Sequence, residues 1–474
     1  MRQQLYEAMK QLEASGGRME GKRVVELALA FSEAETKNEI FWQLHRYWFL
    51  NQNKELIGAQ NVLYDAICSQ YIGEFGVGDF SARLTEQRRK KDGRKKRVLL
   101  SGNAIKNTKH APTRFLVEMG NMFRRNGHEV FVLYTGMMCR SLSLTYPKPF
   151  KFQFPPVIGT GLASIYNYHD ETFNIVQGVR EQFRFEDGLA LLRLVNNPFN
   201  RDDVRMLDEE IAEFAPDFIM SIGGHDPLAE RYASVIGGVW LPQLSATFYS
   251  PHLRPAVTQS MWNTALSTED RKPIKPMAPL IARLPYPVPF YIANPKLNEA
   301  LKRVAEQKPY VAIVGNRLHQ EVTPELKERM VAFHKKTGAR FVLAGDRANQ
   351  LMDANVGIFG LDTIRDLGAL YHFSALNLNP PRGGGGTAAA EATRAGKPTF
   401  TLKFGDVYDA LGDAFAFDDL DAMFAGIERY YEEEAYRQSF AGPIAEKARE
   451  LYDSDLFYKA IMAGLEEQVL SSAS

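Results

Sequence analysis

The stretch Asn377–Lys403, NLNPPRGGGGTAAAEATRAGKPTFTLK, is the most informative part of this chain. An apolar strand pattern ends at Pro380, and a run of glycines at 383–386 leads into a helix pattern that begins near Thr387. Glycine lets a backbone approach a ligand closely, and a helix N-terminus presents unpaired N–H groups to a phosphate. Glu391 lies one helical turn after Thr387, so its carboxylate is placed to accept bonds from ribose hydroxyls. The pattern predicts a nucleotide-phosphate site, and the alternative is a glycine turn with a surface glutamate.

The sequence on both sides of this stretch alternates between strand and helix patterns. Apolar runs predict strands at 310–315, 340–345, 356–360, 375–380 and 398–402, with helices at 324–338 and 387–396. The earlier part of the chain repeats the alternation, with strands predicted at 98–100, 128–135, 217–222 and 239–241 and a helix at 112–127. Strands separated by helices are typical of parallel α/β sheets. The chain is therefore predicted to contain two such units.

The first 80 residues carry a different pattern. Apolar residues recur at spacings of three and four, as at Val24, Leu27 and Phe31, which predicts helices. The segment Arg83–Arg97, rich in Lys and Arg, follows them. We interpret this segment as a solvated linker, and the alternative is a patch for anions or for a membrane surface.

The composition limits the classes to which this protein can belong. Among 474 residues, 57 Lys plus Arg balance 57 Asp plus Glu, which argues against a general nucleic-acid binder. Cys68 and Cys139 are too few for a disulfide framework or a Cys-rich zinc site, and two free thiols are expected rather than one disulfide. The N-terminus lacks the apolar core of a signal peptide, and no run reaches the ~18 apolar residues of a membrane span. We expect a soluble, cytoplasmic protein.

Three patches resemble the GT-B fold of nucleotide-sugar-dependent glycosyltransferases. GGGTAAAEATRAGKP at Gly384–Pro398 is similar to the segment with which these enzymes hold the nucleotide sugar. NMFRRNGHEVFVL at Asn121–Leu133 resembles the helix-to-strand passage of their N-terminal domain. VAIVGNRL at Val311–Leu318 resembles the first strand and loop of their nucleotide domain. In architecture the resemblance covers roughly residues 97–440.

The resemblance implies an α/β fold of GT-B architecture, with two Rossmann-like domains facing a cleft, preceded by an all-helical N-terminal domain. We expect the helical domain at 1–92, the acceptor domain at 93–298, the nucleotide-sugar domain at 299–440 and C-terminal helices that pack back on the cleft at 441–474. The helical domain lies outside the common fold, and we expect it to contribute to acceptor recognition or to self-association.

The resemblance also implies a set of donor-binding residues. Glu391 matches the ribose-binding glutamate of the family, and Lys403 is a candidate phosphate ligand after the next strand. The residues expected to face the diphosphate lie in two loops: Gly315, Asn316, Arg317, Gly384, Gly385, Gly386 and Thr387. Such a basic clamp stabilises the charge that develops on the leaving diphosphate. No metal or other cofactor is expected, and the alternative for Arg317 and Lys403 is solvated surface charge.

The resemblance leaves the catalytic base open. Many retaining enzymes of this fold carry an acid seven or eight positions before the ribose-binding glutamate, and these positions are glycines here, which favours inversion. Direct displacement needs a general base, and histidine titrates near neutral pH. His110 and His225 both follow strands of the first α/β unit and are the candidates, with Asp226 able to orient or replace His225. Each histidine has the alternative role of a hydrogen bonder that caps a loop.

These inferences favour an inverting glycosyltransferase that moves a hexosyl or N-acetylhexosaminyl group from a nucleotide diphosphate sugar, preferably a UDP-sugar, to a hydroxyl of a protein or glycan. No nucleic-acid partner is expected. Membrane contact through Arg83–Arg97 and self-association through the helical domain stay open. The alternatives are a non-hydrolysing nucleotide-sugar epimerase on the same fold, a non-catalytic glycosyltransferase-like partner protein, and a dinucleotide-dependent oxidoreductase, which the absence of an early GxGxxG disfavours.

Overall fold

The structure is a computed structural model of the chain. It describes residues 2–15, 20–34, 55–90, 95–102, 111–134, 201–223, 225–241, 250–255, 295–315, 317–345, 347–362, 367–382 and 384–453, with shorter pieces within 36–44, 184–194 and 455–465. The chain divides into two compact units. The first comprises 1–258, 262–282 and 455–474, and the second comprises 259–261 and 283–454. Cys68 is a buried free thiol, and Cys139 lies outside the described residues.

The first unit contains a parallel sheet with the strand order β5-β2-β1-β6-β7-β8. Its strands are β1 (Arg97–Gly102), β2 (Glu129–Tyr134), β5 (Leu191–Leu194), β6 (Phe218–Ile222), β7 (Gly238–Leu241) and β8 (Arg254–Pro255). In the register, Leu99 of β1 lies between Phe131 of β2 and Ile219 of β6. Parallel strands are covered on both faces, which explains the apolar runs that predict four of these strands. The short β5 and β8 are not among the predicted strands: β8 has only two residues, and the apolar run of β5, LLRL, is interrupted by Arg193.

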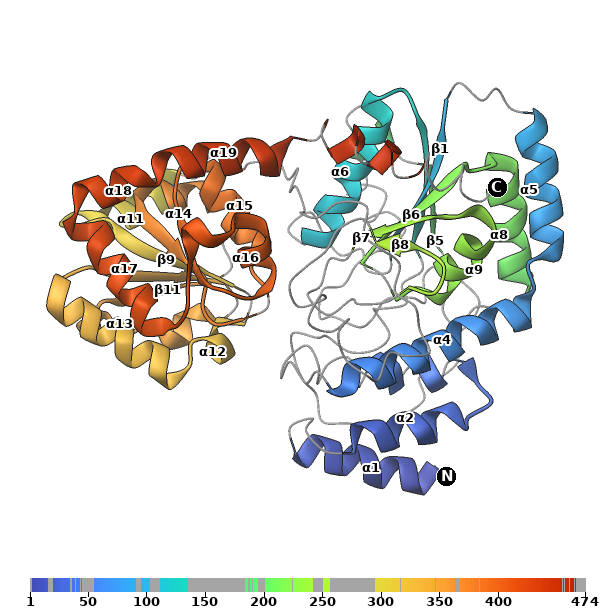
Figure 1. The fold of residues 1–474 in the computed structure, drawn as a ribbon, viewed down its shortest axis with the longest axis horizontal. Helices are drawn as coiled ribbons and strands as arrows, with labels where there is room; N and C mark the ends of the chain where they lie inside the picture. Colours follow the sequence, from blue (N-terminus) through green and yellow to red (C-terminus); the bar gives the residue numbers. More distant parts are fainter. Residues whose placement is uncertain are drawn as a thin grey trace. The chain divides into compact units, whose positions relative to one another are not determined.

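Helices connect the strands of this sheet. They are α6 (Ala111–Arg125), α8 (Arg201–Phe214) and α9 (Pro227–Ile236), and Figure 1 shows α6 and α8 on opposite sides of the strands. The sequence of α9 defines both of its ends: Pro227 lies in the first turn, and Gly237 follows the last residue with a φ of 75°. A short antiparallel pair, β3 (Arg184–Phe185) and β4 (Gly188–Leu189), completes the described strands of this unit.

The N-terminal residues form helices that belong to the first unit. They are α1 (Arg2–Ala14), α2 (Gly21–Leu29), α4 (Glu55–Phe75) and α5 (Gly78–Lys90). The helices predicted for the first 80 residues are thus present in the described part of that segment. Helix α4 packs against α9, and α5 runs alongside α8 (Figure 1).

The interpretation of Arg83–Arg97 as a solvated linker is wrong for its first half, which is the end of α5. Arg88, which is half-buried, donates from Nε to the carbonyl oxygen of Pro216 at 2.9 Å and from Nη2 to that of Asp217 at 3.1 Å. The buried Arg97 pairs with the Asp217 carboxylate at 3.5 Å. These arginines therefore attach α5 and the start of β1 to the segment before β6. A charge run alone does not distinguish such contacts from a solvated surface.

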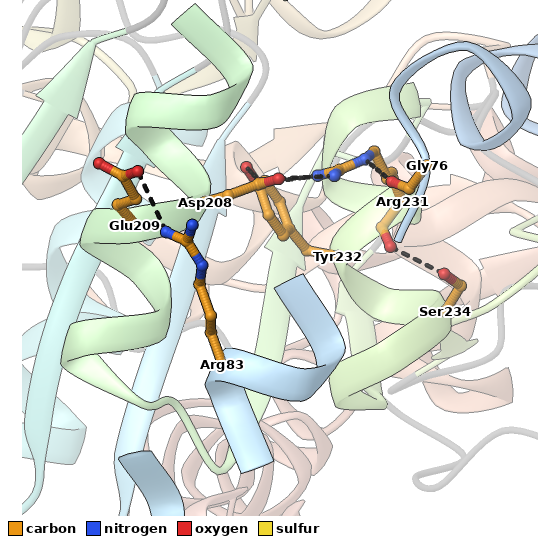
Figure 2. Close-up of polar contacts among 7 residues, drawn as sticks. All are labelled: Gly76, Arg83, Asp208, Glu209, Arg231, Tyr232 and Ser234. Carbon is orange, nitrogen blue, oxygen red and sulfur yellow. Dashed lines mark hydrogen bonds and ion pairs between the residues drawn. The ribbon is translucent and has the colours of Figure 1, made fainter. Parts of the chain in front are cut away.

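A buried arginine joins three segments of the first unit (Figure 2). Arg231 of α9 donates to both carboxylate oxygens of Asp208 in α8, at 2.8 and 2.7 Å, and its Nε donates to the carbonyl oxygen of Gly76 at 2.7 Å. The hydroxyl of Tyr232 donates to the same carboxylate at 2.8 Å. Gly76 lies in the short connection between α4 and α5, so this network ties the N-terminal helices to the α/β sheet.

The second unit contains a parallel sheet with the strand order β11-β10-β9-β12-β13-β14. Its strands are β9 (Tyr310–Val314), β10 (Phe341–Ala344), β11 (Ile358–Leu361), β12 (Ser374–Leu378), β13 (Thr399–Leu402) and β14 (Ala416–Phe417). The five strands predicted here are confirmed, with every end within two residues of the prediction. The short β14 is the one further strand among the described residues of this sheet. The chain order reverses beside β9, which is where ligands bind in such sheets, at the carboxyl ends of the strands.

The described helices of the second unit include the two predicted at 324–338 and 387–396. The described helices are α11 (Pro295–Ala305), α12 (Leu318–Glu321), α13 (Pro324–Thr337), α14 (Leu367–Phe373), α15 (Gly386–Arg394), α16 (Gly405–Leu411), α17 (Leu420–Glu432), α18 (Glu434–Ser439) and α19 (Ala441–Tyr452), with 3-10 turns η3 (Ala348–Leu351), η4 (Ala354–Val356) and η5 (Asp413–Phe415). Thr323 caps α13 by accepting from the Leu326 N–H at 3.2 Å, and Gly338 ends it with a φ of 71°. Among the described helices of either unit, none has the length and apolar character needed to cross a membrane.

Candidate functional site

The glycine run leads into α15 at the carboxyl end of β12. Gly385 has a φ of 115°, in the region that favours glycine, and Gly386 is the first residue of the helix. A Cβ at position 385 would overlap the Asn379 side-chain oxygen, so no larger residue fits this turn. Gly384 has no such neighbour, and Thr387 is half-buried in the first turn of the helix. The predicted turn from strand to helix is therefore present, with main-chain N–H groups at its N-terminus.

Glu391 lies one turn into α15 and is buried, with 3% exposure. Its neighbour Tyr371, in α14, donates from its hydroxyl to the carbonyl oxygen of Ala388 at 2.9 Å. Burial raises the pKa of Tyr371, and the negative charge of Glu391 raises it further, so this tyrosine stays neutral. The alternative role of Glu391 as a surface residue is thus inconsistent with its burial, and the carboxylate lies inside the unit close to the glycine turn.

A cluster of opposite charges occupies the neighbouring strand end. Gly315 follows β9, and Arg317 pairs with Glu321 of α12 at 3.0 Å. The second oxygen of Glu321 accepts from Arg382 at 2.6 Å. Arg317, Glu321 and Arg382 all have at most 14% of their side-chain surface exposed. Arg317 is predicted to bind phosphate. The structure shows that it also pairs with Glu321, a contact that the sequence does not reveal.

The cluster of Arg317, Glu321 and Arg382 carries a net positive charge. Burial tends to raise the pKa of Glu321, but the charges of Arg382 and Arg317 outweigh it, and the pKa is lowered. Burial also lowers the pKa of His319, and the charges of Arg347 and Arg317 lower it further. The imidazole is therefore neutral at pH 7. Two arginines sharing one carboxylate leave a net positive charge at the strand ends, which suits an anionic ligand.

Arg382 is a residue of the site that the motif comparison misses. It lies between two prolines and the glycine run, in PPRGGGG, and its side chain is 8% exposed. It donates from Nε to the Asn379 side-chain oxygen at 2.8 Å and from Nη2 to the Val314 carbonyl oxygen at 2.6 Å. The sequence signal that could have revealed Arg382 is an arginine directly before a glycine run, because a guanidinium group can occupy the space left by the missing glycine side chains.

Lys403 follows β13 and reaches the same edge of the sheet as the other strand ends. It pairs with Asp418 at 2.8 Å, and 43% of its side-chain surface is exposed. The hydrogen bond to Asp418 raises the pKa of Lys403, so the ammonium group stays charged. This pairing fits the surface-charge alternative, and an exposed pair of this kind exchanges partners easily when an anion binds.

The two residues at 225 and 226 follow β6 in the first unit. His225 is 3% exposed with a φ of 53°, and its ring packs against Phe41, Trp42 and Tyr64 at centroid distances of 4.7, 6.0 and 4.8 Å. Asp226 is 1% exposed and caps α9, accepting from the Ala229 N–H at 3.1 Å. In the structure, His225 is enclosed by aromatic side chains of the N-terminal helical segment, and Asp226 holds the start of a helix.

Glu230 lies one turn further along α9, in a buried polar cluster that sequence reasoning misses. It accepts from the His252 N–H at 3.2 Å and from the Tyr64 hydroxyl at 3.5 Å. Burial raises the pKa of Glu230 to about 8, so its carboxyl is largely protonated at pH 7. Burial likewise raises the pKa values of Tyr64 and Cys68. This cluster packs α4 against α9 with neutral polar groups.

His110 and Asn316 lie outside the described residues, so the structure does not locate these two predicted site residues. Among the residues that are described, no group of three or more His, Cys, Asp or Glu side chains is arranged to hold a metal ion. The predicted donor-binding residues that are described lie at one edge of the second sheet, whereas His225 and Asp226 belong to the first unit.

Comparison with solved structures identifies the class of fold. A glycosyltransferase from Rickettsia africae is similar with a TM-score of 0.52 at 11% identity, over 79% of this chain and 98% of that one. An O-GlcNAc transferase mutant from Thermobaculum terrenum matches with a TM-score of 0.49 at 13% identity, over 99% of this chain and 98% of that one. Anabaena HepE in complex with UDP and glucose matches with a TM-score of 0.48 at 12% identity, over 78% of this chain and 100% of that one. The sequence matches no protein-family model and no curated protein.

The two parallel sheets and the likeness to the Rickettsia enzyme together define the architecture. The chain has the α/β fold of GT-B glycosyltransferases, and the prediction of two Rossmann-like units is confirmed. The helices predicted as a separate N-terminal domain belong to the first unit. At 11% identity this likeness concerns the fold. The activity is therefore argued from the site.

Proposed function

We propose that this chain is a glycosyltransferase that uses a nucleotide diphosphate sugar, with a UDP-sugar as the favoured donor and a hexosyl or N-acetylhexosaminyl group as the transferred sugar. The observation that carries the proposal is the passage from β12 through the glycine turn into α15, with Glu391 buried one turn along. Two arginines lie at these strand ends, because Arg317 follows β9 and Arg382 directly precedes the glycine turn. A helix N-terminus with nearby guanidinium groups suits a diphosphate.

The residues of the second unit have distinct roles in this proposal. Main-chain N–H groups at Gly385, Gly386 and Thr387 hold the diphosphate, and the carboxylate of Glu391 accepts from the ribose hydroxyls. Arg317 and Lys403 offset the charge of the leaving nucleotide diphosphate, since negative charge grows on it as the bond to the sugar breaks. Lys403 exchanges Asp418 for phosphate, which a half-exposed ion pair permits.

The transfer step follows from this arrangement. The acceptor hydroxyl oxygen attacks the anomeric carbon, its proton passes to a general base, and the bond from the anomeric carbon to the diphosphate oxygen breaks with its electron pair on the diphosphate. A single displacement of this kind inverts the anomeric centre. We propose His110 as the base rather than His225, because the ring of His225 is enclosed by aromatic side chains and 3% exposed.

The acceptor is proposed to be a protein or glycan hydroxyl recognised by the first unit. The N-terminal helices are part of that unit, and buried contacts attach them to its sheet. They enlarge the surface of the first unit beyond a minimal α/β sheet, which suits an extended acceptor better than a small metabolite.

Ligand binding tests the proposal directly. The wild-type chain is titrated with UDP, GDP and NAD in a calorimeter and in a thermal-shift assay, where a ligand at 100 times its Kd adds ~2.7 kcal/mol of stability. We expect binding of UDP or GDP and none of NAD. Binding of NAD alone would overturn the proposal. Conversion of the donor to its epimer without an acceptor would identify an epimerase instead.

A further inference from the structure

The guanidinium group of Arg382 joins the ends of two neighbouring strands. Its Nη2 donates to the carbonyl oxygen of Val314, the last residue of β9, at 2.6 Å. Its Nε donates at 2.8 Å to Asn379, which follows β12, and its Nη1 donates at 2.6 Å to Glu321 in α12. One side chain therefore connects the loop after β9, the helix α12 and the segment that precedes the glycine turn.

Two glycines leave the space that this guanidinium group occupies. A Cβ on Gly315 would overlap Nη1 of Arg382, and a Cβ on Gly385 would lie 2.8 Å from Nη2. Gly315 does not have a positive φ, so its lack of a side chain is explained by the arginine and not by backbone strain. Glycines on two separate loops thus accommodate one planar group, which donates to three different acceptors in fixed directions.

We propose that Arg382 is a positioning residue for nucleotide binding: it holds the loop after β9 and the glycine turn before α15 in the arrangement that receives the diphosphate. This inference rests on the function proposed above. Lysine cannot replace the group, because its ammonium lacks the planar fork that reaches three acceptors at once. Most of the guanidinium donors are engaged with protein acceptors, so the residue acts through the loops that it orders.

The relationship between Gly315 and Arg382 provides a sharp experiment. Gly315→Ala adds a methyl group that displaces the guanidinium group without removing it, whereas Arg382→Ala removes the group. The double variant places the methyl group where the guanidinium group used to be. We expect each single variant to weaken UDP binding at least tenfold, and the double variant to bind no more weakly than Arg382→Ala alone.

Two further variants separate positioning from charge and from general stability. Arg382→Lys keeps the positive charge but loses the fork, and we expect it to bind UDP nearly as weakly as Arg382→Ala. Arg340→Ala is the matched control, because Arg340 also donates to a main-chain carbonyl, that of Val304 at 2.8 Å, but precedes β10 at the opposite end of the strands. Arg340→Ala should bind UDP like the wild type.

The affinities are measured by calorimetry at a temperature at which circular dichroism shows each variant to be folded. Wild-type affinity in Arg382→Ala, or full rescue by Arg382→Lys, would overturn the inference. If Arg382→Ala does not fold, Gly315→Ala and Arg382→Lys still decide it. A wild-type protein that binds no nucleotide diphosphate would overturn the proposed function and this inference with it. Wild-type binding that survives all these substitutions would overturn this inference alone.

Discussion

Arg231 and Asp208 form a two-bond ion pair in the interior of the first unit, with Nη1–Oδ1 and Nη2–Oδ2 distances of 2.8 and 2.7 Å (Figure 2). The Arg231 side chain is 1% exposed, and that of Asp208 is 16% exposed. The guanidinium group also reaches the Gly76 carbonyl oxygen in the connection between α4 and α5. The pair is therefore one of the links between the N-terminal helices and the α/β sheet.

Removal of one partner of this pair should be costly. Asp208→Ala leaves the Arg231 charge buried without its carboxylate, and we expect the free energy of unfolding to fall by about 3–5 kcal/mol. The matched control is Arg83→Ala, because the Arg83–Glu209 pair joins α5 and α8 but is more than half exposed on both side chains. We expect Arg83→Ala to lower the free energy of unfolding by about 0–1 kcal/mol. Urea denaturation measures both, and equal losses would contradict the assigned role of Asp208.

The stability of the first unit should fall as the pH rises through neutrality. Glu230 has a pKa of about 8 in the folded state against 4.5 for the free group, because burial disfavours its charged form. Between these values the folded chain holds a proton that the unfolded chain has lost. The contribution of the protonated Glu230 to the free energy of unfolding is therefore fully present below pH 4.5. It declines by up to roughly 1.4 kcal/mol per pH unit until about pH 8.

A single substitution isolates this effect. Glu230→Gln resembles the protonated carboxyl and removes the titration, so its unfolding free energy should depend less on pH and exceed that of the wild type above pH 8. Tyr64 and Cys68 face Glu230 from α4; their pKa values are raised, so both stay neutral between pH 4.5 and 8. The negative charge of Asp226 favours protonation of Glu230. Burial lowers the pKa of His252. Identical pH profiles for the wild type and Glu230→Gln would refute the assignment.

The role of Glu391 can be tested through the ribose. If its carboxylate accepts from ribose hydroxyls, the wild type should bind UDP more tightly than 2′-deoxy-UDP. Glu391→Ala should weaken UDP binding by about 1.5–3 kcal/mol, the range for a hydrogen bond to a charged group, and should lose the discrimination. The ratio of the two affinities is an internal control, because damage to the fold would lower both equally. A ratio unchanged by the substitution would remove Glu391 from the ribose site.

The two candidate bases should behave differently. His110→Ala should reduce the transfer rate by about 10²–10⁴-fold, the usual contribution of a general base. His225→Ala removes a ring packed among Phe41, Trp42 and Tyr64, so its main effect should be a loss of thermal stability. Transfer assays at a temperature where both variants are folded measure the difference. Full transfer rates in His110→Ala would exclude it as the base.

Metal chelation provides a further test of the donor site. Because the helix N-terminus, Arg317 and Lys403 are proposed to hold the diphosphate, an excess of EDTA over trace metals should leave UDP affinity and transfer essentially unchanged. Calorimetry with and without EDTA, followed by readdition of Mg²⁺ or Mn²⁺, measures this. Activity that disappears with the chelator and returns with the metal would contradict the expectation.

Much of the fold is predictable because its signals are local. Buried parallel strands are short apolar runs, as at Val98–Leu100 and Tyr310–Val314, and helix ends carry their own caps, as at Thr323 and Gly338. The glycine turn before Glu391 is likewise visible within one stretch of sequence. Prediction errors arise where a local signal has two explanations. The charge run at Arg83–Arg97 is interpreted as a linker from its sequence, but its first half is the end of a helix, and Arg88 there donates to a carbonyl group 128 residues away.

Most strands, several helices and the turn that leads into α15 can be predicted from the chain alone, because each depends on residues close together in the sequence. The contacts between distant side chains become visible only in the folded chain. Arg382 meets Glu321 from 61 residues further along the chain, and Glu230 meets Tyr64 across 166 residues. Such contacts form only when strands and helices pack. A buried polar group then forms hydrogen bonds with the polar groups that packing places next to it, because an unpaired buried polar group is unfavourable. The positioning arginine and the protonated glutamate are therefore properties of the packed chain.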